Sequence, residues 1–453
     1  MVKVINLKWE KRLLTNRSAR AVALDTLIRV LEKDSYSNIS LNNELQKAHL
    51  SANDSNFATR IVYGTIQYKI YLEYQLHDLI KTKLKEIYLR PLLLMSAYQI
   101  IFMDKVPNRA VLNEANKLAK QFGKVNSNGF RIVNGVLRAL IRRQPILPTL
   151  DNLPFYLSVR ESVPEWLVEY LLKHWGAERT ASILSSINEP AKNIVRVSQA
   201  TNLANVISEM NQLGFNPQES TLNLNELIVS HGGISKTSLF KNGEITIQDE
   251  AASLAVQAFD FVGNEQVLDA CSAPGGKTVQ IAENIPQGNV IALDIHENKL
   301  HLVEQNCQRM KVSKRVTTKA LDARNADQAF AAGKFDKVLV DAPCSGLGLI
   351  RRKPEIRYNK KLTDLTDLQK IQLQILDHVC SLLRSGGELV YSTCTITQEE
   401  DEDVVKIFLK KHPEFELKPF KAAKMQAPNG MLKILPDSYG SDGFFISKFV
   451  VRG

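Results

Sequence analysis

The chain has 453 residues, enough for about three domains, and its composition, 44% hydrophobic and 23% charged, is that of a globular protein with sizeable cores. This composition excludes a disordered or fibrous chain. Residues 1–20 are basic but contain no apolar core of signal-peptide length, and no apolar run reaches the roughly eighteen residues of a membrane helix. We therefore expect a cytoplasmic protein with no membrane partner.

The five cysteines form no Cys-x-x-Cys motif, so we expect free thiols and no metal site. Cys307 and Cys380 fall within helical patterns, where a cysteine usually serves as a small apolar side chain. The other three, at positions 271, 344 and 394, follow predicted strands.

The net charge of +10 is unevenly distributed along the chain. Residues 1–150 contain 24 Lys and Arg against 11 Asp and Glu, a net charge of +13, so the remainder carries −3. A basic third joined to a nearly neutral remainder predicts a module that binds a polyanion. The alternative is that its charged helices are only solvated or that it docks a protein.

Residues 16–143 have the apolar periodicity of a helical bundle. Leu24, Leu27, Ile28 and Leu31 lie at i, i+3, i+4 and i+7, on one face of a helix. Similar stripes recur through residues 57–84, 90–102, 110–122 and 130–141, with short connections between them.

Three stretches of this segment carry a resemblance to a known family. They are Arg60-Ile-Val-Tyr-Gly64, Pro107-Asn-Arg-Ala-Val-Leu-Asn-Glu-Ala115 and Phe130-Arg-Ile-Val-Asn-Gly-Val-Leu137. Together they resemble the NusB family of helical RNA-binding proteins. The resemblance implies that residues 1–143 form an RNA-binding domain.

Prolines at 145, 148 and 154 predict a linker after the bundle. A helix is expected to begin at Pro164, a strand at Asn193–Ser198, a helix around Leu203–Leu213 and a strand near Leu227–Val229. We interpret residues 144–237 as this linker and a small α/β connector.

From about residue 245, short apolar runs alternate with helical segments. This rhythm predicts a mostly parallel, doubly wound sheet within residues 238–453. Ligands of such sheets bind outside the carboxyl ends of the strands. The predicted strands are Val267–Ala270, Asn289–Asp294, Arg315–Thr318, Lys337–Asp341 and Glu388–Ser392.

The loop after the first of these strands is a candidate cofactor site. Its glycines allow a ligand close to the backbone, and Asp294, nineteen residues after Gly275, is placed to bind ribose hydroxyls. A P-loop would need glycine at Cys271, and the dinucleotide pattern Gly-x-Gly-x-x-Gly is absent. S-adenosylmethionine, with one carboxylate and one ribose, fits the remaining features. The candidate cofactor residues are Cys271, Ser272, Ala273, Pro274, Gly275, Gly276, Lys277, Asp294, Asp322 and Asp341.

Asp322 has two interpretations of nearly equal weight. It follows the third strand and could bind the adenine edge, or it could cap the helix that it precedes. The run Arg351-Arg352-Lys353 likewise either contacts substrate phosphates, which we favour slightly, or is a solvated turn.

Cys344, in Asp341-Ala-Pro-Cys-Ser-Gly346, and Cys394, in Tyr391-Ser-Thr-Cys-Thr395, both follow strand ends. Methylation at carbon 5 of cytosine needs a thiolate that adds to carbon 6 and turns carbon 5 into a nucleophile. An acid near the ring nitrogen would ease this addition, and Asp341 is the candidate.

These motifs, with Asp442-Gly-Phe-Phe445, resemble the RNA cytosine-5 methyltransferases over residues 238–453. The resemblance implies that Cys394 is the nucleophile, that Cys344 assists proton removal or release, and that Asp341 contacts the cytosine. DNA cytosine methyltransferases attack with a Pro-Cys cysteine alone, and amino-directed enzymes usually carry Pro-Pro-Tyr after the fourth strand.

A NusB-like domain fused to such a catalytic domain is similar to the small-subunit (16S) ribosomal RNA methyltransferases of the Sun or Fmu type. The resemblance implies S-adenosylmethionine as cofactor and ribosomal RNA, naked or partly assembled into the small subunit, as partner of a monomer. Two alternatives remain at this point: an assembly factor without catalytic activity, and the same chemistry acting on transfer RNA.

Overall fold

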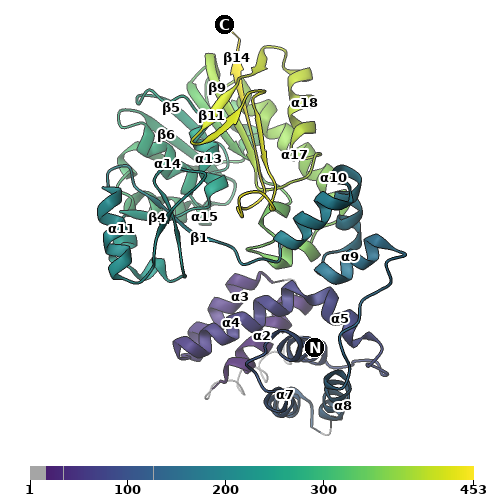
Figure 1. The fold of residues 1–453 in the computed structure, drawn as a ribbon. Helices are drawn as coiled ribbons and strands as arrows, with labels where there is room; N and C mark the ends of the chain where they lie inside the picture. The colour runs from purple at the N-terminus through teal and green to yellow at the C-terminus, as the bar shows by residue number, and fades with distance from the viewer. Residues whose placement is uncertain (1–16, 34, 126, 453) are drawn as a thin grey trace. The chain divides into compact units, whose positions relative to one another are not determined.

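The computed structural model describes residues 17–33, 35–125 and 127–452, and it divides the chain into two compact units (Figure 1). The helical unit extends as far as Asn188 and includes Lys353–Asn359. The sheet unit consists of Glu189–Arg352 and the residues from Lys360 onward. Most of the stretch in which we expect no signal segment lies outside the described residues. Among the described helices, none is both long and apolar enough to cross a bilayer.

The helical unit is built from amphipathic helices around one core. The predicted stripe forms one face of α2 (Ala19–Lys33), where Leu24 and Leu27 are fully buried. Tyr88, Leu92 and Leu137 belong to the same core. The other helices of the bundle are α3 (Ser37–Ala48), α4 (Ala52–Gln67), α5 (Lys69–His77), α6 (Leu89–Phe102), α7 (Asn108–Phe122) and α8 (Gly129–Ile141).

Two further helices follow the bundle, α9 (Leu153–Glu161) and α10 (Glu165–Ser186). Pro164 immediately precedes α10, as the sequence predicts. Gly176 has a φ of 71°, which interrupts the helical geometry within α10. The apolar pattern of the sequence does not predict this break, because a single glycine is also compatible with an uninterrupted helix.

A short segment from far along the chain completes the helical unit. It forms the 3₁₀ helix η5 (Pro354–Tyr358). The Ser37 hydroxyl donates to Glu355 at 2.8 Å, and the fully buried Arg357 donates to the carbonyl of Ser162 at 3.0 Å. The sequence gives no indication of this, because the partners are more than 190 residues apart.

The sheet unit begins with a small antiparallel sheet, ordered β2-β3-β1-β4. Val195 and Leu227 are buried between this sheet and α11 (Leu203–Gln212), the helix predicted here. The fourth strand comes from beyond residue 237. The strands are β1 (Asn193–Val197), β2 (Gln218–Glu219), β3 (Glu226–Val229) and β4 (Ile245–Ile247).

The main sheet has eight strands, in the order β10-β14-β9-β8-β5-β6-β7 with β13 beside β14. The five predicted strands run parallel, which confirms the doubly wound class, and β14 enters antiparallel to β9. The parallel strands are β5 (Gln266–Asp269), β6 (Asn289–Asp294), β7 (Val316–Ala320), β8 (Phe335–Asp341) and β9 (Leu383–Thr393).

Helices cover both faces of this sheet (Figure 1). One face packs against α13 (Glu250–Gln257), α14 (Gly276–Asn284) and α15 (Glu297–Arg309). The other packs against α16 (Ala326–Ala329), α17 (Leu362–Cys380) and α18 (Glu402–Lys411). The remaining strands are β10 (Phe415–Leu417), β11 (Phe420–Ala422), β12 (Met425–Ala427), β13 (Met431–Ile434) and β14 (Phe444–Val451).

Candidate active site

A pocket of about 470 Å³ opens at the carboxyl ends of the parallel strands; we call it the strand-end pocket. The topology brings the glycine loop, the carboxylates and two cysteines to this one edge. Seven of the residues singled out from the sequence line it: Cys271, Ala273, Asp294, Asp322, Asp341, Cys344 and Cys394.

The loop between β5 and α14 has two consecutive glycines: Gly275, where a side chain would not fit, and Gly276, where the space beside the backbone is empty. Gly275 has a φ of 103°, and a Cβ there would lie 2.9 Å from the Cα of Val303. A Cβ at Gly276 would meet no atom within 4 Å. No side chain caps the start of α14, so its first amides remain available to a carboxylate ligand.

Two other residues of this loop fasten it to the sheet and to α15. The Ser272 hydroxyl donates to the carbonyl of Leu293 at 2.9 Å. The Pro274 carbonyl accepts from the side chain of Asn306 at 2.9 Å. These bonds show that Ser272 and Pro274 hold the loop in position, whereas its neighbours Cys271 and Ala273 face the pocket.

Asp294 ends β6, Asp322 follows the adjacent strand β7, and both line the same pocket. One oxygen of Asp294 accepts from the backbone of His296 at 2.8 Å. Asp322 caps the 3₁₀ helix η3 (Ala323–Asn325) and also accepts from the Arg324 guanidinium at 2.6 Å and 3.0 Å. Hydrogen bonding from Arg324 lowers the pKa of Asp322. The capping interpretation of Asp322 is thus confirmed, and the residue faces the pocket as well.

Lys277, predicted as part of the cofactor loop, pairs instead with Asp341. Its ammonium donates to one Asp341 oxygen at 2.8 Å, while the Ser392 hydroxyl donates to the other at 2.9 Å. Burial alone would lower the pKa of Lys277, but the Asp341 carboxylate and the nearby Cys394 raise it above its usual value. Lys277 is therefore a fixed positive charge beside the candidate nucleophile.

The sulfur atoms of Cys344 and Cys394 lie 3.2 Å apart. The hydrogen bond with Cys394, and then burial, raise the pKa of the Cys344 thiol well above its ordinary value. Cys307 and Cys380 are buried, and burial raises the pKa of each thiol to about 12, as expected of apolar side chains that do not react.

A buried carboxylate holds the two cysteine loops together. Glu400, which is fully buried, accepts from the backbone of Ser345 at 2.7 Å and from the Thr397 hydroxyl at 2.8 Å. The hydroxyls of Ser345 and Thr395 lie 2.7 Å apart. Each cysteine is the immediate neighbour of one of these residues, so the short distance between the sulfurs is set by this network.

The basic run after Cys344 is used within the fold rather than left for a substrate. Arg352 forms ion pairs with Asp249 and Asp442 at 2.6 Å and 2.5 Å. Arg351 donates to backbone carbonyls, including that of Pro436 at 2.7 Å. The expectation that this run contacts phosphates is therefore wrong for both arginines.

Several pocket residues escaped the sequence analysis. His296 and Lys299 follow Asp294 within five residues, a position from which they could have been suspected. Ile371 and Ile375 come from α17, where one-turn spacing of isoleucines indicates only a core face. Within the described part of the chain, no group of three or more His, Cys, Asp or Glu is arranged to hold a metal ion.

Comparison with known proteins extends these observations. Residues 17–142 match the NusB family, and residues 256–450 match the family described as 16S rRNA methyltransferase RsmB/F. A probable ribosomal RNA small subunit methyltransferase B of Bacillus subtilis (strain 168) is 37% identical over 96% of this chain and 99% of its own length.

Solved structures share the fold. The crystal structure of PH0851 has a TM-score of 0.81 and 24% identity, covering 94% of this chain and 98% of its own. A methyltransferase homolog from Pyrococcus horikoshii has a TM-score of 0.58 and 26% identity, covering 67% of this chain and all of its own. The glycine loop with free helix amides and the two carboxylates fit S-adenosylmethionine. The chain belongs to the ribosomal RNA small subunit methyltransferase B family, whose members are S-adenosylmethionine-dependent rRNA methyltransferases of the RsmB/F type.

Proposed function

We propose that this protein methylates carbon 5 of a cytosine in 16S ribosomal RNA, through a covalent adduct on Cys394. The observation that carries the proposal is the pair of sulfurs 3.2 Å apart in a pocket that also contains Asp341. A methyltransferase acting on an exocyclic nitrogen needs no thiol, whereas cytosine carbon 5 needs both a nucleophile and a route for release.

The first step forms a bond between the Cys394 sulfur and carbon 6 of the cytosine. The thiolate supplies the electron pair, and carbon 5 gains nucleophilic character as the ring double bond shifts. Asp341 would accept a hydrogen bond from the protonated ring nitrogen and so stabilise the electron-rich adduct. Lys277 keeps Asp341 in place and lies near the sulfur that must be ionised.

In the second step carbon 5 attacks the methyl group of S-adenosylmethionine. The carbon–sulfonium bond breaks, and its electrons remain on the sulfur of S-adenosylhomocysteine. A base then removes the carbon 5 proton, and those electrons restore the ring double bond as the Cys394 sulfur leaves. The Cys344 sulfur lies 3.2 Å from the Cys394 sulfur, and this proximity supports a role for Cys344 in the last step.

Two serine substitutions test this division of roles. Cys394→Ser should neither methylate RNA nor form an adduct, because serine cannot replace the thiolate. Cys344→Ser should accumulate a protein–RNA complex that survives denaturing electrophoresis, because addition and methyl transfer proceed while release stalls. The substrate is full-length 16S rRNA transcript, or partly assembled small subunit, with S-adenosylmethionine.

Cys307→Ser is the matched control, since this buried cysteine lies outside the strand-end pocket and should leave methylation intact. Bisulfite sequencing of the treated RNA locates the modified base. If the adduct appears with Cys394→Ser and not with Cys344→Ser, the two roles are reversed. If the original protein turns over no S-adenosylmethionine with the 16S rRNA transcript, the partly assembled subunit or transfer RNA, the protein is an assembly factor without catalytic activity. If it methylates transfer RNA alone, it is a transfer RNA methyltransferase.

A further inference from the structure

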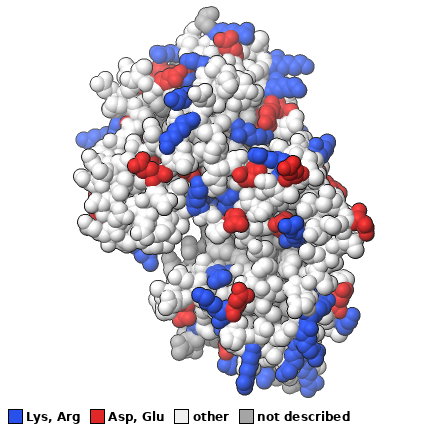
Figure 2. All heavy atoms as spheres, viewed as in Figure 1, with Lys and Arg blue, Asp and Glu red and all other residues white. Residues whose placement is uncertain are grey.

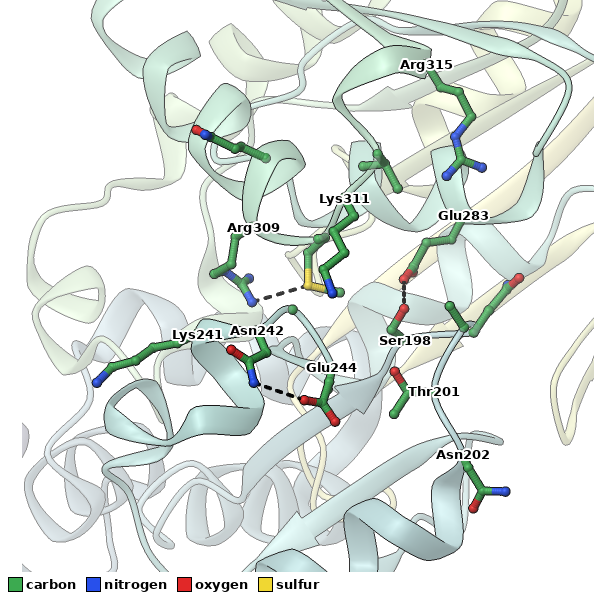
Figure 3. A pocket seen from close by; sticks show the side chains of 16 residues that line it. Ser198, Thr201, Asn202, Lys241, Asn242, Glu244, Glu283, Arg309, Lys311 and Arg315 are labelled. Carbon is green, nitrogen blue, oxygen red and sulfur yellow. Dashed lines mark hydrogen bonds between the residues drawn. The ribbon is translucent and has the colours of Figure 1, made fainter.

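A second pocket, larger and more polar, lies between the small sheet and the helices α14 and α15 of the sheet unit. Its volume is about 850 Å³, and we call it the basic pocket (Figure 3). Its walls are the segment 198–202 after β1, the turn 241–244 before β4, Glu283 of α14, and residues 308–312 and 315 at and beyond the end of α15. It shares no lining residue with the strand-end pocket.

Four cations and two carboxylates line the basic pocket. Lys241, Lys311 and Arg315 form no ion pair among the described residues, and Lys311 and Arg315 extend toward the middle of the group, with Lys241 at its margin (Figure 3). Glu283 does not neutralise them, because it is already bound by the buried Arg196 and by the Ser198 hydroxyl at 2.7 Å.

The fourth cation, Arg309, forms no ion pair among the described residues, and its hydrogen bonds go to neutral groups. Its guanidinium donates to the carbonyls of Phe240 and Ile245, both at 3.0 Å, and to the Thr246 hydroxyl at 2.9 Å. All of these partners are neutral. With Glu283 paired to Arg196, the four cations of the lining face one other carboxylate, Glu244, so the wall keeps a net positive charge that a bound anion could balance.

The turn 241–244 of this wall packs closely against the end of α15. Gly243 has a φ of 75°, and a Cβ there would lie 2.0 Å from the carbonyl oxygen of Arg309. The turn that includes Lys241 therefore lies against the last residue of α15, two residues before Lys311. A site held in this way does not have to be ordered when a ligand binds.

The pocket offers no surface on which a base could stack. No aromatic residue lines it, and the nearby Phe240 ring is covered by the Arg309 guanidinium, 3.9 Å from the ring centroid. Proteins recognise unpaired bases by stacking them on exposed aromatic rings. A free nucleotide would lack such a platform here, whereas the phosphodiester backbone of RNA does not require one.

We propose that Lys241, Lys311 and Arg315 bind backbone phosphates of the substrate RNA at nucleotides away from the one that is methylated. The inference rests on ribosomal RNA as substrate, but not on which base or atom is modified. The 13 residues of α15 separate this pocket from the edge that holds Asp294, about 20 Å at 1.5 Å per residue. Contacts this far from the reacting base affect RNA binding and leave the chemical step unchanged.

The test compares two triple variants of the full chain that lose the same charge. Lys241→Ala/Lys311→Ala/Arg315→Ala empties the basic pocket of free cations. Lys406→Ala/Lys410→Ala/Lys421→Ala is the matched control, because these three lysines are exposed elsewhere on the sheet unit and form no ion pair among the described residues. Binding of 16S rRNA transcript is measured over a range of salt concentrations, without catalysis, so the result is independent of the cytosine chemistry.

The pocket variant should bind RNA about ten-fold more weakly near 0.1 M salt, with a log–log salt slope shallower by about 2, since each lost phosphate contact contributes about 0.7. The control variant should keep the original slope. In turnover, the pocket variant should raise KM for RNA and leave kcat and S-adenosylmethionine affinity unchanged. The single variant Arg315→Lys, which keeps the charge and leaves Lys241 and Lys311 unchanged, should retain most of the RNA affinity of the original protein.

Two outcomes would overturn the proposal. The first is equal loss of RNA affinity in the pocket variant and the control, which would show that only net charge matters. The second is unchanged RNA affinity in the pocket variant together with lost binding of inorganic phosphate, which would make the pocket a site for small anions. Unchanged melting temperature and S-adenosylmethionine affinity confirm that both variants are folded.

Discussion

At the scale of single residues, the two carboxylates of the strand-end pocket are held in different ways. Asp322 is bound by the guanidinium and the backbone of Arg324, so part of its charge is already used within the protein. Asp294 is bound by one backbone N–H, from His296. Asp294 therefore has more capacity left to accept hydrogen bonds from ribose hydroxyls.

Asp294→Ala should weaken S-adenosylmethionine binding by about 1.5–3 kcal/mol, the scale of a hydrogen bond to a charged group. The S-adenosylmethionine affinity of Asp294→Asn should lie between those of the original protein and Asp294→Ala, because asparagine keeps an acceptor for the His296 N–H but loses the charge. Calorimetric titration measures both, with Asp367→Ala on the exposed face of α17 as control. Affinity unchanged in Asp294→Ala would remove this residue from the cofactor site.

At the scale of elements, a buried carboxyl joins the end of β5 to the start of α14. The Thr278 hydroxyl donates to Asp269 at 2.6 Å, while the other Asp269 oxygen is buried without a partner in the described structure. Burial raises the pKa of Asp269 from 3.8 to about 7, and the nearby Asp341 carboxylate adds to the rise. The folded protein therefore holds this proton at pH values where the unfolded chain has released it.

This linkage predicts how stability depends on pH. Between about pH 4 and pH 7 the folded state binds the Asp269 proton more tightly, so the free energy of unfolding falls as pH rises through this range. Asp269→Asn keeps the acceptor for Thr278 and cannot ionise. The difference in unfolding free energy, variant minus original, should increase from pH 5 to pH 7 and then level off.

Urea unfolding at a series of pH values measures this difference. Asp367→Asn is the control, because that carboxylate is 71% exposed and should give a difference that does not change with pH in this range. Parallel stability curves for the original protein and Asp269→Asn between pH 5 and pH 7 would mean that Asp269 is already ionised in the folded state at pH 5.

Elements with strong local patterns were predictable from the sequence, and elements defined by distant partners were not. The stripe of α2 and the apolar runs of the parallel strands are local, and the structure confirms them. The strand β14 was missed, because its assignment depends on pairing with β9, more than 50 residues earlier. The segment η5 was missed for the same reason, since its partners lie in the helical unit.

The same distinction applies to the candidate site. Loop motifs at strand ends indicated Cys344, Cys394 and Asp294, because topology alone brings strand ends together. The pairing of Lys277 with Asp341 was not predicted, since both lie at the sheet edge and only the side-chain geometry decides which groups meet. Arg352 was misjudged because its carboxylate partners, Asp249 and Asp442, are distant in sequence.

At the scale of the whole molecule, the positive charge is concentrated on the bundle. Residues 1–150 carry a net charge of +13 and the remaining residues carry −3, which together give +10. Lys and Arg side chains gather over this part of the chain in the space-filling view (Figure 2). Such a distribution favours phosphate contacts by the NusB-like domain. Deleting residues 1–143 is a poor test of this idea, because it would also remove Ser37 and Gln67, which bond to Glu355 and Arg357.

Neutralising exposed lysines of the bundle tests the idea without this damage. Lys81, Lys83 and Lys85 lie in the exposed loop between α5 and α6. If the bundle binds RNA, Lys81→Ala/Lys83→Ala/Lys85→Ala should weaken binding of 16S rRNA and reduce the log–log salt slope by about 2, at 0.7 per phosphate. S-adenosylmethionine affinity should not change, because these lysines and the strand-end pocket belong to different units.

Combining these three substitutions with those of the basic pocket gives the most informative comparison. The two sets of substitutions share no residue and, among the described residues, no hydrogen-bond or ion-pair partner. Their effects on the free energy of RNA binding should therefore add within about 0.5 kcal/mol. RNA would then contact both units of the same molecule. If the bundle variant binds RNA with the affinity and salt slope of the original protein, the bundle is a solvated spacer or docks a protein, and the RNA contacts lie in the sheet unit alone.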